Sequence, residues 1–284
     1  MFFTALTATS VLMLTPITDL PTMFWGIAPE VRYADLPALK KKHDKAVVFL
    51  HGLQPHVFHP EKATKPQVHD WQEPGGVLVK QLSEDFDIFG FSYAQMQSVD
   101  SITLSRGLRT GINALKTAEY NEIVLIGHSA GAIIAREFTE CFPNDGITKV
   151  IAVSGPHEGS GWARLPTFTL PKTQVAFINS LLPDVRIALR KERSAKLPKS
   201  LEFCCVITKW NRTDHDTVVS LRSQWPPDLQ DQGIPAVLAS CNHFDVMTNE
   251  AAIKSITELA KGKVVRWKPE QTELAQQKLF GSSK

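Results

Sequence analysis

Short apolar runs and helix-like repeats alternate along this chain from residue 45 onward. The apolar runs occupy 46–50, 86–93, 122–127, 149–154, 202–208 and 235–240. Such runs, bounded by turn-forming residues, are typical of strands that are buried on both faces. Apolar residues at helical spacing lie between them, over 101–115, 133–138 and 250–260. Strands that alternate with helices predict an α/β protein with a mostly parallel central sheet and helices on both faces.

Two long stretches interrupt this alternation. Residues 53–75 contain four prolines and three of the nine histidines, and residues 158–200 lie between two predicted core strands. Long connections in a compact domain are usually functional, and we expect the second one to form a small helical lid. The sequence thus divides into an N-terminal extension (1–44), one domain (45–262) that carries the insertion 158–200, and a polar C-terminal tail (263–284).

The composition is that of an ordinary globular protein and excludes several classes. Hydrophobic residues make up 43% and charged residues 21% of the chain, which is usual for a soluble domain. Lys and Arg number 31 against 29 Asp and Glu, a formal charge of +2, so nothing favours nucleic acid as a partner. Four cysteines are too few for a disulfide scaffold, and we expect four reduced thiols that pack as small hydrophobes.

The N-terminal stretch leaves the location of the protein open. Residues 2–14 are apolar but shorter than the roughly 20 residues that span a bilayer. They lack the basic region and the small-residue cleavage site of a signal peptide. We expect a cytoplasmic protein. The alternatives are export or membrane association through residues 1–26, or an overcalled start, with Met13 or Met23 as the first residue.

The segment Gly127-His128-Ser129-Ala130-Gly131 matches the pattern G-x-S-x-G. It follows an apolar run and precedes a helical pattern, the context in which this motif holds a serine on a sharp strand-to-helix turn. A turn of this kind needs small neighbours, and Gly127, Ala130 and Gly131 are small. The helix that begins there would direct N–H groups and a positive dipole end toward developing negative charge.

Three further features lie at the ends of predicted strands. His51-Gly52 ends the first run, the segment DHDTVV at 214–219 follows the run 202–208, and His243 follows the last run. With these motifs in this order, residues 45–262 resemble the α/β-hydrolase superfamily, in the layout of its lipase and esterase branch. The resemblance implies an α/β-hydrolase fold with the small helical lid insertion described above.

The same resemblance implies roles for individual residues. The chain order Ser129, Asp216, His243 is the family's order of nucleophile, acid and base. His243 would take the proton of Ser129 as its oxygen attacks an acyl carbon, and Asp216 would hold the imidazole in the correct tautomer. Backbone N–H groups of Leu53 and Ala130 would bind the oxyanion. This chemistry needs no cofactor and no metal.

Alternatives to two of these residues stay open. Asp216 fits the family's D-x-x-V segment, because Val219 lies three residues later. Asp214 remains an alternative acid, and Asp245 is a weaker one because it lies only two residues from His243. We expect the histidine inside the G-x-S-x-G motif to point away from the serine. Three histidines are weaker candidates for the base: His128, His157 and His215.

Two clusters outside the motifs have more than one interpretation. Four histidines and an aspartate gather within 20 residues: His51, His56, His59, His69 and Asp70. Their spacing matches no common zinc pattern, and we expect solvated or hydrogen-bonded histidines in a loop over the active site. A basic amphipathic helix is indicated by Arg186, Arg190, Lys191, Arg193, Lys196 and Lys199. It is either a solvated face or a lid that contacts anionic lipid.

The sequence therefore predicts a serine hydrolase that cleaves carboxylic (acyl or lipid) esters through an acyl-enzyme. The predicted lid would line an acyl pocket with Trp162, Phe168, Phe177, Leu181 and Leu182. A thioesterase or acyltransferase with the same triad is the alternative within the enzymes. A non-catalytic binding protein on the same fold is the alternative outside them. Acyl length, alcohol and oligomeric state stay open.

Overall fold

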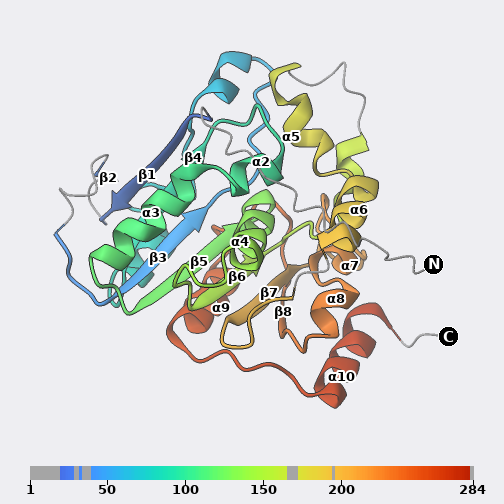
Figure 1. Ribbon diagram of the computed structural model, residues 1–284. Helices are drawn as coiled ribbons and strands as arrows, with labels where there is room; N and C mark the ends of the chain where they lie inside the picture. Colours follow the sequence, from blue (N-terminus) through green and yellow to red (C-terminus); the bar gives the residue numbers. More distant parts are fainter. Residues whose placement is uncertain (1–19, 29–31, 34–39, 165–171, 194–195, 282–284) are drawn as a thin grey trace, which may run out of the picture.

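One mixed sheet forms the centre of the computed structural model, which describes residues 20–28, 32–33, 40–164, 172–193 and 196–281 (Figure 1). Within these residues eight strands lie in the order β2-β1-β4-β3-β5-β6-β7-β8. They are β1 (Thr22–Ile27), β2 (Arg32–Tyr33), β3 (Lys45–Leu50), β4 (Asp87–Tyr93), β5 (Glu122–His128), β6 (Lys149–Val153), β7 (Glu202–Thr208) and β8 (Ala236–Ala239). Strand β1 pairs antiparallel with β2 and β4, and the other pairs are parallel. The predicted mostly parallel sheet is confirmed.

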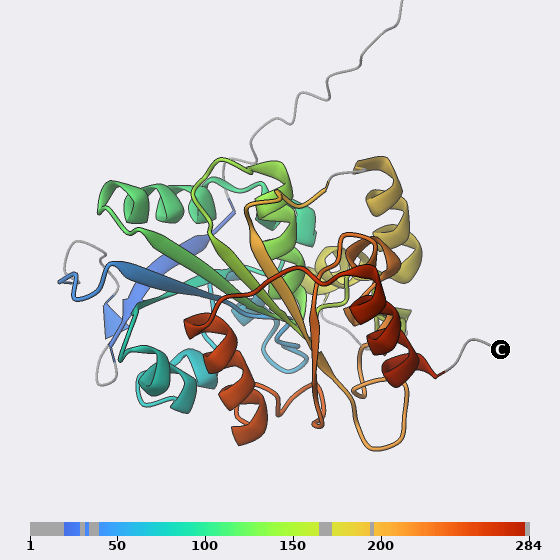
Figure 2. The same cartoon turned by 90° about the horizontal axis from the view of Figure 1, so that it is seen from below.

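Helices cover both faces of the sheet (Figure 2). One face carries α2 (Val99–Thr103), α3 (Arg106–Thr117) and α4 (Ala130–Cys141), and the other carries α1 (Val77–Leu82) and α9 (Glu250–Lys261). Strand β3 packs against the helices on both faces, because successive side chains of a strand point to opposite faces. Its Val48 and Leu50 pack toward α3 and α4, while Val47 and Phe49 pack toward α1 and α9.

The single helix predicted over 101–115 is two helices in the structure. Helix α2 ends at Thr103 and α3 begins at Arg106. Ser105 between them has the extended backbone of an N-cap residue, with φ −63° and ψ 152°, a position that serine favours over a helix interior. The break lets α2 pack against α4 while α3 packs against β1.

Both predicted flanking segments contribute to the fold. Residues 22–27 of the predicted N-terminal extension form β1, and Trp25 in it is fully buried. The tail after 263 is polar in sequence but forms α10 (Pro269–Phe280). There Trp267 and Phe280 pack on the buried ring of Trp225, with centroids 5.9 and 6.2 Å away. The C-terminal segment therefore packs against the core.

The described part of the insertion 158–200 contains four short helices. Its elements are η4 (Gly161–Arg164), η6 (Lys172–Gln174), α5 (Val175–Asn179) and α6 (Pro183–Arg193). Two of the residues predicted to line an acyl pocket, Phe177 and Leu181, are buried in the main core, and Phe168 lies outside the described residues. The other short elements are η2 (Pro60–Thr64), η3 (Asp70–Gln72), α7 (Leu221–Gln224) and α8 (Pro227–Gln230). No described helix has the length and apolar character needed to cross a bilayer.

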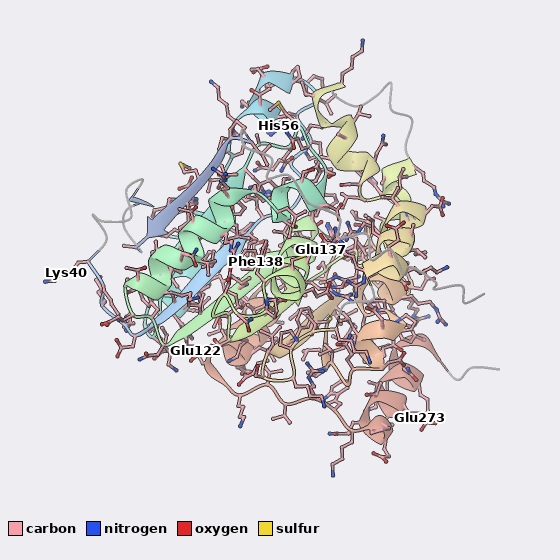
Figure 3. All side chains as sticks on the ribbon, viewed as in Figure 1. Lys40, His56, Glu122, Glu137, Phe138 and Glu273 are labelled. Atoms are coloured by element: carbon pink, nitrogen blue, oxygen red, sulfur yellow. The ribbon has the colours of Figure 1, made fainter. Side chains whose placement is uncertain are left out.

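The arginines of α6 are engaged inside the fold. Arg186 is 1% exposed and pairs with the buried Glu137 of α4 (labelled in Figure 3) and with Asp100 at 3.2 Å. Arg190 pairs with Glu140 at 2.6 Å, and Arg193 lies 2.6 Å from Asp100 and 2.8 Å from Glu137. Helix α4 presents carboxylates to α6, so the three arginines form neither the solvated face nor the lipid-facing patch that their spacing suggested.

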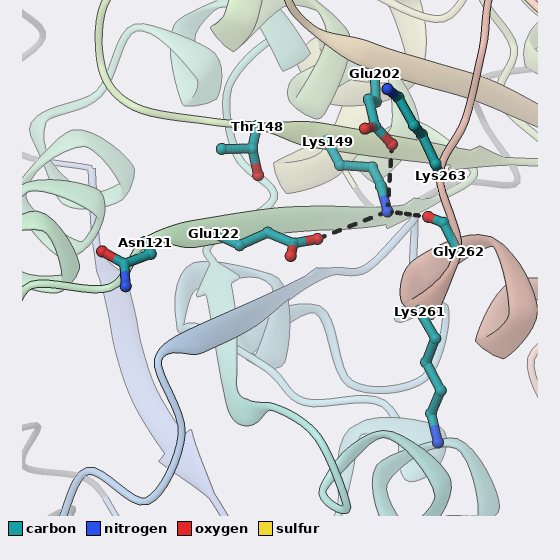
Figure 4. Close-up of a pocket in the computed structure, with 8 residues that line it drawn as sticks. All are labelled: Asn121, Glu122, Thr148, Lys149, Glu202, Lys261, Gly262 and Lys263. Carbon is teal, nitrogen blue, oxygen red and sulfur yellow. Dashed lines mark hydrogen bonds and ion pairs between the residues drawn. The ribbon is translucent and has the colours of Figure 1, made fainter.

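A second ion-pair cluster lies at the N-terminal ends of β5, β6 and β7 (Figure 4). Lys149, the first residue of β6, is almost fully buried. Its Nζ donates to the carbonyls of Ala260 and Gly262 at 3.0 and 2.6 Å and pairs with Glu122 and Glu202 of the neighbouring strands. Lys149 therefore ties β5, β6 and β7 to the end of α9 beside a polar pocket.

Burial also changes the titration of several histidines. His51, His128 and His157 are at most 7% exposed. Burial, the largest cause, lowers the pKa of His51 to about 3 and of the largely buried His69 to about 4. It lowers the pKa values of His128 and His157 well below the ordinary range, and nearby arginines lower that of His157 further. These four rings are therefore neutral in the folded protein at neutral pH.

We expect removal of one carboxylate from the α4–α6 network to destabilise the fold. In Glu137→Gln the buried Arg186 loses its closest anionic partner, and breaking a buried pair on one side costs about 3 kcal/mol or more. Urea denaturation measures the free energy of unfolding. The matched control is Glu273→Gln on the exposed face of α10, which we expect to stay within about 0.5 kcal/mol of wild type. Equal stabilities of the two variants would contradict this interpretation of the network.

We expect stability to fall in acid because of the buried histidines. Above pH 6.5 neither state binds these protons. Below it the unfolded chain takes them up, whereas folded His51 and His69 resist until pH approaches 3 to 4, so the free energy of unfolding decreases across that window. In His157→Phe, the slope of the free energy of unfolding against pH should decrease between pH 6 and 4 by up to about 1.4 kcal/mol per pH unit. Urea denaturation at graded pH measures this slope. The exposed His59→Gln is the control, and equal slopes would contradict the prediction.

Candidate active site

Ser129 lies on a strained turn between β5 and α4. Its backbone has φ 56° and ψ −124°, a left-handed conformation that is costly for a residue with a side chain. The Ser129 N–H donates to the carbonyl of Val153 at 2.9 Å, which joins the turn to the end of β6. The predicted strand–turn–helix context of the G-x-S-x-G motif is therefore present, with Ala130 as the first residue of α4.

Glycines allow this turn to pack against the end of β3. A Cβ on Gly131 would lie 2.2 Å from the carbonyl oxygen of Leu50, and a Cβ on Gly127 would lie 2.3 Å from that of Gly131. Both distances are shorter than real contacts allow. Gly52 has the same constraint from the other side, since its Cβ would lie 2.6 Å from the Cβ of Ser129. His51-Gly52 therefore lies directly against the serine.

A continuous chain of hydrogen bonds joins the three residues of the predicted triad. Ser129 Oγ lies 2.9 Å from His243 Nε2, and His243 Nδ1 lies 2.7 Å from Asp216 Oδ2. All three residues are largely buried, with Ser129 still 8% exposed. The carboxylate can only accept, so His243 Nδ1 carries the proton and Nε2 is free to accept one from the serine hydroxyl.

Asp216 is held by four hydrogen bonds. Its Oδ1 accepts the N–H groups of Val218 and Val219 at 3.0 and 2.7 Å, and its Oδ2 accepts from Thr208 Oγ1 at 2.6 Å as well as from His243. Burial opposes ionisation of this carboxyl, but the hydrogen bonds from His243, Thr208 and Val219 outweigh it, so its pKa is lowered. Asp216 is therefore an anion facing the imidazole.

Four of the rival residues, Asp214, Asp245, His157 and His215, are not hydrogen-bonded to the side chain of Ser129 or His243. Asp214 and Asp245 are exposed, and the carboxylate of Asp245 is bonded by Asn242. His215 is also exposed, and His157 is buried with neither ring nitrogen hydrogen-bonded to any described residue. Among the predicted alternatives, the geometry brings together only Ser129, Asp216 and His243.

The ring of His128 packs beside that of His243, with centroids 5.0 Å apart. Its Nε2 lies 3.1 Å from the His243 carbonyl and donates to it, since a carbonyl can only accept. The side chain of His128 is therefore a support for His243.

Two backbone N–H groups beside the serine are available to a ligand. The Leu53 N–H meets no hydrogen-bond acceptor among the described residues. Ala130 is the first residue of α4, where a backbone N–H has no acceptor within the helix. These are the two donors predicted to bind an oxyanion.

The histidine cluster forms ring contacts. His51 stacks on Tyr93 with centroids 4.3 Å apart and lies 5.0 Å from His69, and the ring of Trp71 meets that of His128 edge-on. His59 is exposed. No group of three or more metal-ligating side chains occurs within the described ranges. These ring contacts thus join His69 and Trp71 of the loop 53–75 to His51 and to His128 beside the serine.

The motifs did not reveal Thr208, which donates to Asp216 and is hydrogen-bonded to Ser154 at 2.7 Å. A signal was present, because Thr208 is the last residue of β7 and carboxyl ends of parallel strands gather around one site. Polar residues at strand ends were therefore the class to inspect.

Comparisons with known proteins identify the fold. No protein-family model matches the sequence, and no curated protein matches it with statistical significance. Among solved structures, the mature lipase BlEst2 of Bacillus licheniformis has a TM-score of 0.57 at 12% identity, over 84% of this chain and 97% of that one. Phospholipase PlaB of Legionella pneumophila has a TM-score of 0.56 at 14% identity, over 83% and 61% of the two chains. Esterase Pf2001 of Pyrococcus furiosus has 0.52 at 16%, over 84% and 85%.

At such low identity the likeness concerns the arrangement of the backbone. The shared arrangement is the mostly parallel sheet with helices on both faces, and the lipases and esterases that share it are α/β-hydrolases. As the sequence predicts, this chain has the α/β-hydrolase fold.

Proposed function

We propose that this chain is a serine hydrolase that cleaves carboxylic esters of acyl or lipid type through an acyl-enzyme. The observation that carries the proposal is the unbroken hydrogen-bond chain from Ser129 Oγ through His243 to Asp216, at 2.9 and 2.7 Å. A serine hydroxyl is a weak nucleophile alone, and a hydrogen-bonded imidazole with an oriented carboxylate is what activates it.

The acylation step follows from these positions. Ser129 Oγ attacks the ester carbonyl carbon while its proton passes to His243 Nε2. The carbonyl oxygen becomes an oxyanion that accepts the N–H groups of Leu53 and Ala130, a stabilisation of about 3 kcal/mol for each donor. The intermediate then collapses, the C–O bond to the alcohol breaks, and the imidazolium returns its proton to the leaving alkoxide.

Deacylation repeats the steps with water. The oxygen of a water molecule attacks the acyl carbon while His243 Nε2 accepts a proton from that water. The bond from the acyl carbon to Ser129 Oγ then breaks, the imidazolium returns its proton to Ser129 Oγ, and the carboxylic acid leaves. Asp216 stays ionised throughout, because its four hydrogen bonds lower its pKa, and it stabilises the transient imidazolium. Thr208 supports that carboxylate from behind.

The choice of esters as substrates rests on the neighbours in fold. They are a lipase, a phospholipase and an esterase by name, which supports an ester rather than an amide substrate. A thioesterase or acyltransferase would use the same three residues, so turnover of acyl-CoA alongside simple esters of graded chain length distinguishes these activities.

We expect Ser129→Ala to abolish activity. Removing the nucleophile of a triad lowers kcat by roughly 10⁴-fold or more, and it removes the site at which a fluorophosphonate probe would attach. The measurements are hydrolysis of short p-nitrophenyl esters and probe labelling. The control is Ser200→Ala at an exposed position, which should keep both. Full activity of Ser129→Ala would contradict the mechanism. A wild-type protein that the fluorophosphonate probe does not label would favour a non-catalytic binding role.

We expect the aspartates of the segment 214–219 to differ sharply in importance. Asp216→Asn should lower kcat by about 10⁴-fold, because an amide stabilises the wrong tautomer of the imidazole. The matched control, Asp214→Asn, removes an exposed carboxylate two residues away and should stay within about twofold. Steady-state kinetics on one p-nitrophenyl ester measures both, and a larger loss in Asp214→Asn would reassign the acid.

A further inference from the structure

Residues at and just after the end of β4 donate hydrogen bonds to two carbonyl oxygens of the turn 51–53. The Tyr93 hydroxyl donates to the carbonyl of His51. The Gly52 carbonyl accepts Gln95 Nε2 at 3.0 Å and His51 Nδ1 at 2.8 Å. A carbonyl can only accept, so the neutral His51 ring carries its proton on Nδ1. Two donors from different parts of the chain therefore fix the direction of one carbonyl.

The direction of that carbonyl also fixes the direction of an N–H group. Gly52 C=O and Leu53 N–H belong to the same peptide unit, which is planar and trans, so the two bonds point in opposite directions. Donors that hold Gly52 O on one side therefore aim the Leu53 N–H to the other. Hydrogen bonds to a carbonyl also polarise its peptide and make the N–H a better donor.

A second glutamine locks the first. Gln174, in η6 of the insertion, donates from Nε2 to Gln95 Oε1 at 2.9 Å and to the Gln54 carbonyl at 2.8 Å. Its Oε1 accepts the His56 N–H at 2.9 Å, and Gln95 Oε1 accepts the Gln54 N–H at 3.1 Å. Gln54 is thus held on both sides of its backbone, directly after the Leu53 donor.

Gln95 and Gln174 are buried, which holds the pair in one arrangement. Gln95 and Gln174 are 1% and 0% exposed, and every side-chain polar atom of the pair takes part in the bonds above. Buried polar networks with all members satisfied specify one arrangement. The insertion and the segment that contains His56 lie next to each other where η6 meets η2 (Figures 1 and 3).

We infer that Gln95 and Gln174 are positioning residues of the reaction, which aim the Leu53 N–H at the developing oxyanion and so make the insertion part of the catalytic support. This inference rests on the proposed function. It assigns the two glutamines an effect on the chemical step rather than on substrate binding. Neither residue touches the reacting atoms.

The test compares an ester with its thionoester, in which sulfur replaces the carbonyl oxygen. The thionoester intermediate places its charge on sulfur, a weaker hydrogen-bond acceptor, so its hydrolysis depends less on the N–H donors. In Gln95→Met we expect kcat on the ester to fall about 10- to 100-fold, less than the roughly 10²- to 10³-fold cost of removing a donor outright. KM and the thionoester rate should stay within about threefold, so the ester-to-thionoester ratio falls.

Gln174→Met tests the pair from the insertion, with a smaller fall expected, and the double variant should lose less than the product of the single losses. Gln230→Met, which removes a buried glutamine with two hydrogen bonds in α8, is the control and should keep the wild-type ratio. Thermal unfolding of each variant reports loss of structure separately.

The outcomes separate this inference from the proposed function. If wild type hydrolyses the ester and reacts with a fluorophosphonate, but the variants keep its ratio, the inference is wrong and the proposed function stands. Equal losses on both substrates would also overturn it, since they indicate general disruption. A wild-type protein without either activity would overturn the two together.

Discussion

The steric contact between the serine turn and the end of β3 is the constraint on which the site depends. Ser129 adopts a left-handed backbone, and the strain is held by packing in which Gly131 touches the Leu50 carbonyl and Gly52 touches Ser129. No side chain fits between these segments. Because β3 and β5 are parallel neighbours, the turn after β3 and the turn that carries Ser129 lie at the same end of the sheet. The proposed nucleophile and the two proposed N–H donors therefore all belong to these two adjacent turns.

The groups around this contact are neutral histidine rings and one fully hydrogen-bonded carboxylate, that of Asp216. Burial holds His51, His69 and His128 neutral, so none of these three rings competes with a protonated His243 for Asp216. The carboxylate is satisfied by Thr208 and two backbone N–H groups. Asp216 thus places a fixed negative charge beside the imidazole of His243.

The sequence predicted the central strands closely, because a run such as 202–208 is buried on both faces and coincides with β7. It also selected Ser129, Asp216 and His243, since each follows a strand end and the parallel sheet gathers those ends. What it could not supply were pairings between distant elements. The spacing of Arg186 describes a basic helix face but says nothing of Glu137, 49 residues away in the chain. Trp267 likewise stands in a polar segment whose partner, Trp225, is known only from the fold.

The pairing of α6 with α4 has a consequence for protein engineering. The segment that carries α6 is not an independent module of the fold. Here the segment supplies the cations that neutralise Glu137 and Glu140, on the helix whose first residue adjoins the nucleophile position. A transplanted segment without those cations would leave the buried Glu137 without a cationic partner, whereas Glu140 would keep Arg136 of its own helix. Replacing this segment would therefore also require a substitution of the buried carboxylate in α4.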